Sequence, residues 1–157
     1  MKIDYLANHQ HLIPVIARWY FDTWGKFSEN PSIENVKIRL ANRLNTDKLD
    51  ICFLCFDDDC NNELIGTFSL RQKDIPHNED LCPSLSHLLV IEKYRRQKIG
   101  ETFINYAKQQ AKNFGFEKMY LYTIDKTVHL WYERLGWKII KEDVVGKFDI
   151  KIMETNL

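Results

Sequence analysis

At 157 residues the chain is the size of one ordinary domain with a sizeable core, and its 22 Lys plus Arg equal its 22 Asp plus Glu. This balance creates no overall field that favours nucleic acid or a membrane, no apolar run approaches the roughly 20 residues of a membrane span, and residues 1–5 lack a signal-peptide core. We therefore expect one cytoplasmic domain over residues 1–157 with no nucleic-acid or membrane partner.

The spacing of apolar residues predicts alternating helices and strands, without a linker or an internal repeat. A short strand is expected over residues 2–5 and a helix over residues 9–24, with Ile13, Ile16, Ala17 and Tyr20 on one side. A second helix over residues 32–44 begins with a near-capping box at Ser32. Three strands over residues 50–56, 63–73 and 85–91 then follow.

Two features of this first half suggest metal sites but are better explained otherwise. Asp57, Asp58 and Asp59 lie in a polar turn between two strands, and they lack the spacing of a calcium-binding EF-hand loop. Cys52 and Cys55 form a C-x-x-C pattern, but strand positions three apart point to opposite faces of a sheet. We therefore expect a solvated turn, structural thiols and no metal.

The most informative segment joins a buried strand to a helix. It reads Tyr94-Arg95-Arg96-Gln97-Lys98-Ile99-Gly100-Glu101, between the strand over residues 85–91 and a helical pattern over residues 102–112. The exposed N–H groups and the dipole of a helix N-terminus attract anions, and basic side chains add charge. Taken alone, the segment fits either a solvated surface turn or a phosphate site.

A second strand and helix follow. A strand is expected over residues 118–124, and residues 125–137 predict a short helix that Gly136 closes. Residues 137–142 and 147–153 then predict a terminal hairpin.

The two strand-to-helix segments together resemble the GCN5-related N-acetyltransferase (GNAT) superfamily. Its acetyl-CoA turn, Arg/Gln-x-x-Gly-x-Gly/Ala, is matched here by Arg95, Ile99 and Gly100, and its tyrosine motif is matched by residues 132–137. The resemblance covers nearly the whole chain. It implies the α/β GNAT fold, with a mixed sheet of about six to seven strands, a splay between the two central parallel strands, and about four flanking helices.

Three positions depart from the family pattern. Lys98 stands where the family usually has its first glycine, and we expect it to adopt right-handed helical geometry with its ammonium group towards phosphate. Asp125 stands where an Asn often precedes the tyrosine helix, and we interpret it as an N-cap. Ser84 occupies a place where some members carry a glutamate base.

The resemblance implies an acetyl-CoA-dependent N-acetyltransferase in which a primary amine of a small molecule or peptide attacks directly, in a ternary complex. Tyr132 would be the general acid at the departing CoA thiolate, and Glu79, Asp80 and His87 are weak candidates for the base. An N–H of Leu89 or Val90 would stabilise the oxyanion. The residues expected to bind acetyl-CoA are Leu88, Leu89, Val90, Arg95, Arg96, Gln97, Lys98, Ile99, Gly100, Glu101 and Asp125.

Several alternatives stay open at this level. The departures at Lys98, Asp125 and Ser84 suggest a non-catalytic acyl-CoA-binding module of the same fold. Trp19, Tyr20, Trp24 and Phe27 fit either an aromatic acceptor cleft or ordinary core. The sequence names no acceptor, and it allows a monomer or a homodimer.

Overall fold

The computed structural model describes residues 1–157, which divide into two compact units. Unit 1 comprises residues 1–69 and 87–100, and unit 2 comprises residues 70–86 and 101–157. No helix of the chain is both long and apolar enough to cross a membrane.

Unit 1 contains two helices and one side of the sheet. Strand β1 (Lys2–Tyr5) leads through the 3-10 helix η1 (Leu6–Leu12) into α1 (Ile13–Trp24), and the 3-10 helix η2 (Gly25–Phe27) leads to α2 (Ile33–Ala41). Strands β2 (Ile51–Asp57) and β3 (Glu63–Arg71) follow, and the later part of β4 (Ser84–Val90) is followed by the 3-10 helix η3 (Glu92–Tyr94). The predicted first helix therefore begins as a 3-10 turn with a kink at His9, and the second ends three residues early.

Unit 2 contains the remaining elements. Helix α3 (Ile99–Asn113) starts at the boundary between the units and leads to β5 (Lys118–Thr123), α4 (Val128–Arg134) and the hairpin of β6 (Lys138–Val145) and β7 (Phe148–Asn156). Gly115 and Gly136 both adopt a φ of +86° after α3 and α4, and the end of α4 at Gly136 agrees with the sequence prediction.

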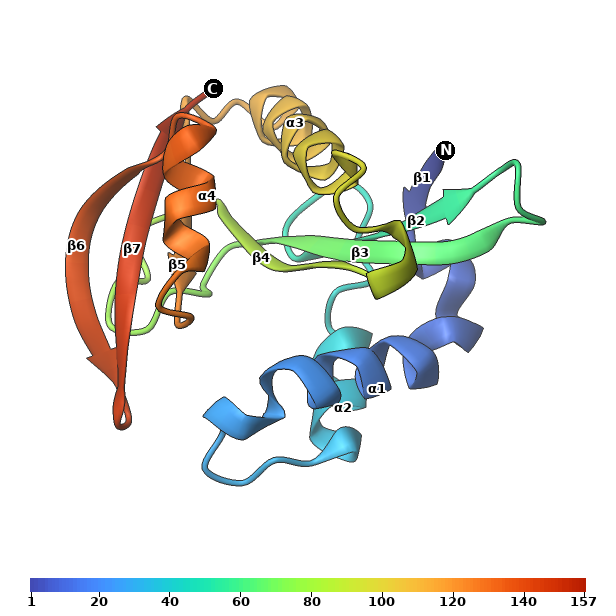
Figure 1. Cartoon of the computed structure of the whole chain (residues 1–157), viewed down its shortest axis with the longest axis horizontal. Coiled ribbons are helices and arrows are strands. Elements are labelled where there is room, and N and C mark those ends of the chain that lie inside the picture. The colour runs from blue at the N-terminus through green and yellow to red at the C-terminus, as the bar shows by residue number, and fades with distance from the viewer. The chain divides into compact units, whose positions relative to one another are not determined.

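The strands follow the order β1-β2-β3-β4-β5-β7-β6 in one seven-stranded sheet (Figure 1). Strands β4 and β5 are parallel and pair at Ser84 and Tyr120, whereas β5 with β7 and β6 with β7 are antiparallel. This confirms the predicted α/β class, with a mixed sheet and four α-helices.

Each unit has its own apolar core. In unit 1, α1 and α2 pack against each other, and Ile16, Ala17 and Leu40 join Cys52 and Leu54 of β2 in one buried cluster (Figure 1). In unit 2, a smaller cluster forms around three isoleucines, Ile75, Ile150 and Ile152. The larger core of unit 1 fixes α1 and α2 over the strands that carry the candidate site.

Candidate active site

Strand β4 runs from Ser84 to Val90 and is distorted at His87, where the backbone adopts a φ of +52°. A non-glycine residue in this left-handed region locally disturbs the regular strand ladder, as in a β-bulge. Leu88, Leu89 and Val90 follow directly, and the Val90 carbonyl accepts a hydrogen bond from Arg95 Nε at 3.0 Å. The segment expected to meet the thioester arm therefore begins at a local distortion of the strand.

The imidazole of His87 lies in an aromatic cluster of unit 1. Its ring stacks on Tyr20 with centroids 4.7 Å apart and an interplanar angle of 24°, and it meets Trp24 edge-on at 5.2 Å. The Tyr20 hydroxyl lies 3.2 Å from Thr67 Oγ1, and burial raises the pKa of this phenol. The Tyr20 side chain is therefore uncharged at neutral pH and held in place beside His87.

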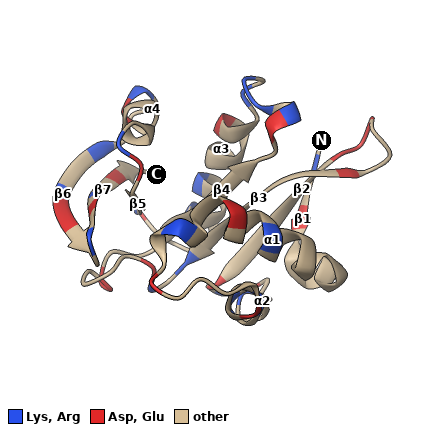
Figure 2. Cartoon of the chain, turned by 60° about the horizontal axis from the view of Figure 1, so that its bottom comes forward, with Lys and Arg blue, Asp and Glu red and all other residues tan.

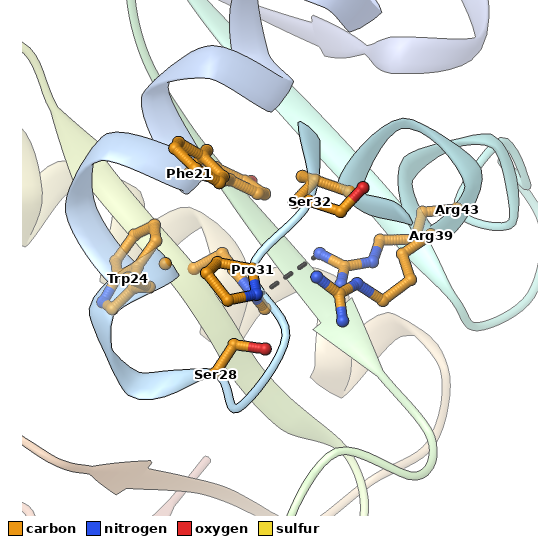
Figure 3. A pocket seen from close by; sticks show the side chains of 11 residues that line it. Phe21, Trp24, Ser28, Pro31, Ser32, Arg39 and Arg43 are labelled. Atoms are coloured by element: carbon orange, nitrogen blue, oxygen red, sulfur yellow. Dashed lines mark hydrogen bonds between the residues drawn. The ribbon is translucent and has the colours of Figure 1, made fainter. Parts of the chain in front are cut away.

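The cluster borders a cavity of about 50 Å³ between α1, α2 and β4 (Figure 3). We call it the arginine pocket, because two arginines contribute its only fixed charges. Its lining residues are Tyr20, Phe21, Trp24, Gly25, Ser28, Pro31, Ser32, Val36, Arg39, Arg43 and His87. Of the four aromatic residues proposed for an acceptor cleft, Tyr20 and Trp24 line this cavity, whereas Trp19 and Phe27 do not.

Arg43 is the buried charge of the pocket. The residue is 2% exposed, and its Nη1 lies 3.4 Å from Ser69 Oγ and 3.4 Å from His87 Nδ1. A guanidinium group only donates, so Nδ1 of His87 accepts in this pair and the imidazole proton stays on Nε2. Reasoning from the sequence missed Arg43 and Arg39, although their spacing of four residues at the end of a predicted helix was visible.

The basic loop of unit 1 runs from Arg95 to the start of α3. Residues 95–98 are exposed, and Figure 2 shows Lys and Arg colouring much of the loop that leads into α3. The preceding Tyr94 is buried, and its hydroxyl lies 2.8 Å from both Asp57 Oδ2 and Glu63 Oε2, which share its one hydrogen. The two acids thus anchor Tyr94 at the start of the loop. The sequence, in which Tyr94 precedes two arginines, did not predict this anchoring contact.

The expected helical geometry of Lys98 is wrong. Lys98 adopts a φ of +61°, as does Arg96, so both residues are left-handed. The family's glycine would adopt this conformation without strain, whereas a residue with a Cβ atom pays about 1–2 kcal/mol. The loop therefore keeps the shape that glycine normally supplies, with a lysine in its place.

Tyr132 lies in α4 of unit 2 and is 8% exposed. Its ring contacts Trp131, with centroids 4.8 Å apart, and Trp137 at 5.6 Å. Burial raises the pKa of the Tyr132 phenol, which therefore stays protonated at neutral pH. This placement is compatible with the predicted proton donor, and equally with a side chain that only packs in the core.

The predicted N-cap at Asp125 lies two residues too early, because α4 starts at Val128 and its N-cap is Thr127; Asp125 instead holds the turn that precedes the helix. Its Oδ1 accepts hydrogen bonds from the backbone N–H of Thr127 at 2.8 Å and of Val128 at 3.1 Å. The Thr127 hydroxyl donates to the same oxygen at 2.8 Å. This oxygen of the Asp125 carboxylate therefore stabilises the turn that leads into α4.

The candidate bases are divided between the units. Glu79 and Asp80 are exposed in unit 2, where Glu79 pairs with Lys73 at 3.2 Å, whereas His87 belongs to unit 1. Ser84 is fully buried, and its hydroxyl donates to Asp74 Oδ2 at 3.3 Å. Asp74 also pairs with Arg71, so the carboxylate next to Ser84 is a structural ion pair that the sequence did not indicate.

The cysteines do not converge on a common site. Cys52 and Cys55 are buried, as predicted for structural thiols, and burial raises the pKa of the Cys55 thiol to about 12. No three His, Cys, Asp or Glu side chains gather where they could hold a metal ion.

Comparison with known proteins identifies the family. The sequence matches the acetyltransferase (GNAT) family over residues 13–137. The chain belongs to this family. The match covers both motifs described above, including the kinked strand β4, the basic loop and the Tyr132 helix.

One individual relative matches about half of the chain. The chain is 31% identical over 80 residues to an aminoalkylphosphonate N-acetyltransferase of Salmonella typhimurium, a match that covers 50% of this chain and 52% of that protein. The chain therefore spans about half the length of this relative.

Solved structures share the whole fold. A ribosomal-protein-alanine N-acetyltransferase from Brucella melitensis superimposes with a TM-score of 0.76 at 16% identity, covering 100% of both chains. An aminoglycoside 6'-N-acetyltransferase in complex with coenzyme A gives a TM-score of 0.72 at 19% identity, covering 99% of this chain and 97% of that one. These similarities establish the GNAT fold.

Proposed function

We propose that this chain is an N-acetyltransferase that uses acetyl-CoA as donor and a primary amine as acceptor. Family membership supports the proposal, and the observation that carries it is the junction of β4 with the basic loop. Within unit 1, a strand distorted at His87 is followed by residues 95–100, which combine positive charge with a helix start. We also propose that residues 1–157 form a single acetyltransferase domain, since the family match runs through both units.

The loop suits the pyrophosphate of acetyl-CoA. Arg95, Arg96 and Lys98 supply charge, and the first N–H groups of α3 are the usual donors to a phosphate at a helix N-terminus. Leu88, Leu89 and Val90 would hold the pantetheine arm through backbone groups. We assign the N–H of Leu89 or Val90 to the thioester oxygen, because the developing oxyanion needs a hydrogen-bond donor.

From the ammonium form of the acceptor, two protons leave the nitrogen, one before attack and one after the N–C bond forms, and one proton reaches the CoA sulfur as the C–S bond breaks. An alkyl amine with a pKa near ~10.4 loses its proton at pH 7 at a cost of roughly 4 to 5 kcal/mol. The contact of Arg43 with His87 Nδ1 weakens His87 as the base, because the accepting nitrogen faces the guanidinium. Glu79 and Asp80 remain the carboxylate candidates, acting through water.

Tyr132 is assigned to the departing sulfur. Its raised pKa keeps the hydroxyl protonated, which suits a hydrogen bond that strengthens as the C–S bond breaks better than full proton transfer. We expect Asp125 to contribute to the cofactor site only indirectly, through the start of the helix that carries Tyr132.

The names of similar proteins indicate which classes of acceptor to consider. Proteins similar to this chain are named for small amines, including an aminoalkylphosphonate and an aminoglycoside, and one is named for a ribosomal protein. We propose a small-molecule amine, with a peptide amine as the alternative. The protein would act as a monomer or a homodimer.

Release of free CoA thiol tests the proposal. The purified chain should release thiol from acetyl-CoA only when an acceptor amine is added. Tyr132→Phe keeps the aromatic packing and removes the hydroxyl, so the dissociation constant of acetyl-CoA should stay nearly fixed while turnover falls by on the order of 10²-fold.

Two other outcomes would contradict the assignment. A well-folded Tyr132→Phe protein with unchanged turnover would remove Tyr132 from the mechanism. Tight binding of acetyl-CoA with no turnover of any amine would favour the alternative, a non-catalytic acyl-CoA-binding module. Ser84 agrees with this alternative, because some family members carry a glutamate base at this place.

A further inference from the structure

The arginine pocket has the charge of an anion site. Its lining includes Arg39 and Arg43 and no Asp or Glu. Figure 3 shows the guanidinium groups of both arginines pointing into the pocket, towards Pro31. Two like charges four residues apart repel each other, and burial removes Arg43 from water. A bound anion would offset both effects.

The polar groups of the pocket match such a guest. Guanidinium groups present planar pairs of donors that fit the two oxygens of a carboxylate or the oxygens of a phosphonate. Ser32 Oγ accepts a hydrogen bond from the backbone N–H of Asn35 at 3.3 Å, which leaves its hydroxyl hydrogen for a ligand. Tyr20 and Trp24 form an apolar wall, which lowers the local dielectric constant and strengthens the charge interaction.

The size of the pocket limits what it holds. A water molecule needs roughly 10–15 Å³ of cavity volume, so a cavity of about 50 Å³ has room for a group of a few heavy atoms. This is the size of a carboxylate or phosphonate head, and far less than a sugar ring system or a folded peptide segment occupies.

The place of the pocket ties it to the acetyl acceptor. His87, which closes the pocket beside Arg43, immediately precedes Leu88–Leu89–Val90, the segment assigned above to the thioester arm. A ligand anchored at the arginines would therefore extend towards the residues next in the strand. A short carbon chain is enough to join the anchored group to a reacting nitrogen.

We propose that the arginine pocket binds the anionic group of the acetyl acceptor, and that the substrates are small primary amines with a carboxylate or a phosphonate. This inference rests on the proposed acetyltransferase function and specifies its acceptor. Polyamines are poor substrates on this proposal, because their second ammonium group would face two arginines.

Matched acceptors test the charge requirement. Thiol release is measured with β-alanine and 2-aminoethylphosphonate, which carry the two anionic groups, and with ethylamine and spermidine, which carry none. The wild-type chain should use at least one anionic amine with a kcat/KM at least about 10-fold above ethylamine, because hydrogen bonds to charged groups have that strength. The better of the two anionic amines identifies the head group. A preference for ethylamine or spermidine would overturn the proposal.

Variants place the anion in the pocket. Arg39→Gln removes the charge of an exposed residue and should lower the ratio of kcat/KM for the anionic amine over ethylamine by about 10- to 100-fold, with partial recovery in Arg39→Lys. Lys37→Gln is the matched control, since Lys37 lies on α2, pairs with Glu34 and does not line the pocket. An unchanged ratio in Arg39→Gln, or an equal fall in Lys37→Gln, would overturn the assignment.

Calorimetry separates this proposal from the proposed function. Binding of each anionic amine is titrated in the presence of CoA, where no turnover is needed. Binding to the wild type that is lost in Arg39→Gln supports the pocket even if no amine is acetylated, an outcome that would count against catalysis alone. If neither anionic amine binds, the pocket assignment is wrong whatever the turnover.

Discussion

Lys98 departs from the family pattern in residue type, in a backbone conformation that favours glycine. Lys98 keeps the left-handed conformation, with a φ of +61°, at the position where the family usually has glycine. Retaining the conformation at a cost indicates that the path of the loop matters more than the residue that forms it. The lysine then places an additional ammonium group in the basic loop.

Substitutions at this position have an unusual order. Lys98→Gly should be more stable than Lys98→Ala by about 1 kcal/mol, because glycine enters the left-handed region without strain. In right-handed helical geometry the order is reversed, since alanine is then the more stable by roughly 0.5–1 kcal/mol. Urea unfolding of both variants decides, and alanine as the more stable residue would contradict the left-handed conformation.

The sequence could predict Gly100, Arg95 and Tyr132 as candidate site residues because their motif spacing is local. It could not predict Arg43, because a buried arginine is recognised only from what surrounds it. Its neighbours, Ser69 and His87, are 26 and 44 residues away along the chain. The handedness of Lys98 was also missed, since a lysine before a helix is normally right-handed.

The elements were predictable where apolar spacing determines them. Strand β1 has the predicted bounds, and β2, β3, β4 and β5 differ by one or two residues at their ends. The 3-10 helices η1 and η3 were not predicted as such, because their form depends on hydrogen bonds at the strand ends. The distortion at His87 within β4 was equally hidden, since its sequence reads as a continuous strand.

The junction of β1 and η1 is held by one carboxylate. Asp4 accepts hydrogen bonds from His9 Nε2 at 3.0 Å, Asn8 Nδ2 at 2.8 Å and the Tyr5 backbone N–H at 2.8 Å. Burial raises the pKa of Asp4, but these bonds outweigh it and lower the pKa from 3.8 to about 2. The folded state therefore stabilises the ionised form of Asp4.

This junction gives a pH dependence with a definite sign. Because the folded pKa lies below the unfolded one, the stabilisation is complete above about pH 4 and is lost as the pH falls through about 2. Asp4→Asn should lower the free energy of unfolding at pH 7 by about 1–2 kcal/mol. The gap between variant and wild type should narrow at pH 3, as measured by urea unfolding; a gap independent of pH would contradict the role of the charge.

At the scale of the whole molecule, the family pattern spans both compact units. The basic loop and the arginine pocket belong to unit 1, whereas Tyr132 belongs to unit 2. We therefore expect acetyl-CoA binding to increase the thermal stability of the folded chain.

Ligand-linked stability measures this property. At a concentration about 100 times its dissociation constant, acetyl-CoA should stabilise the native state by about 2.7 kcal/mol, which raises the Tm of a chain of this length by roughly 5–10 °C. Pantetheine at the same concentration should raise the Tm much less, because it lacks the pyrophosphate that the basic loop would hold. Equal shifts with both compounds would contradict the assignment of residues 95–100.

The placement of the four tryptophans has an optical consequence. Trp24 stands edge-on to His87 in the arginine pocket, with Trp19 earlier on the same helix, whereas Trp137, 2% exposed, and Trp131 pack around Tyr132 in unit 2. Each unit thus carries its own pair of intrinsic fluorophores. Emission from the first pair is sensitive to polarity at the pocket, and emission from the second pair to the surroundings of the Tyr132 helix, so replacing one pair with phenylalanine isolates the signal of the other without an added label.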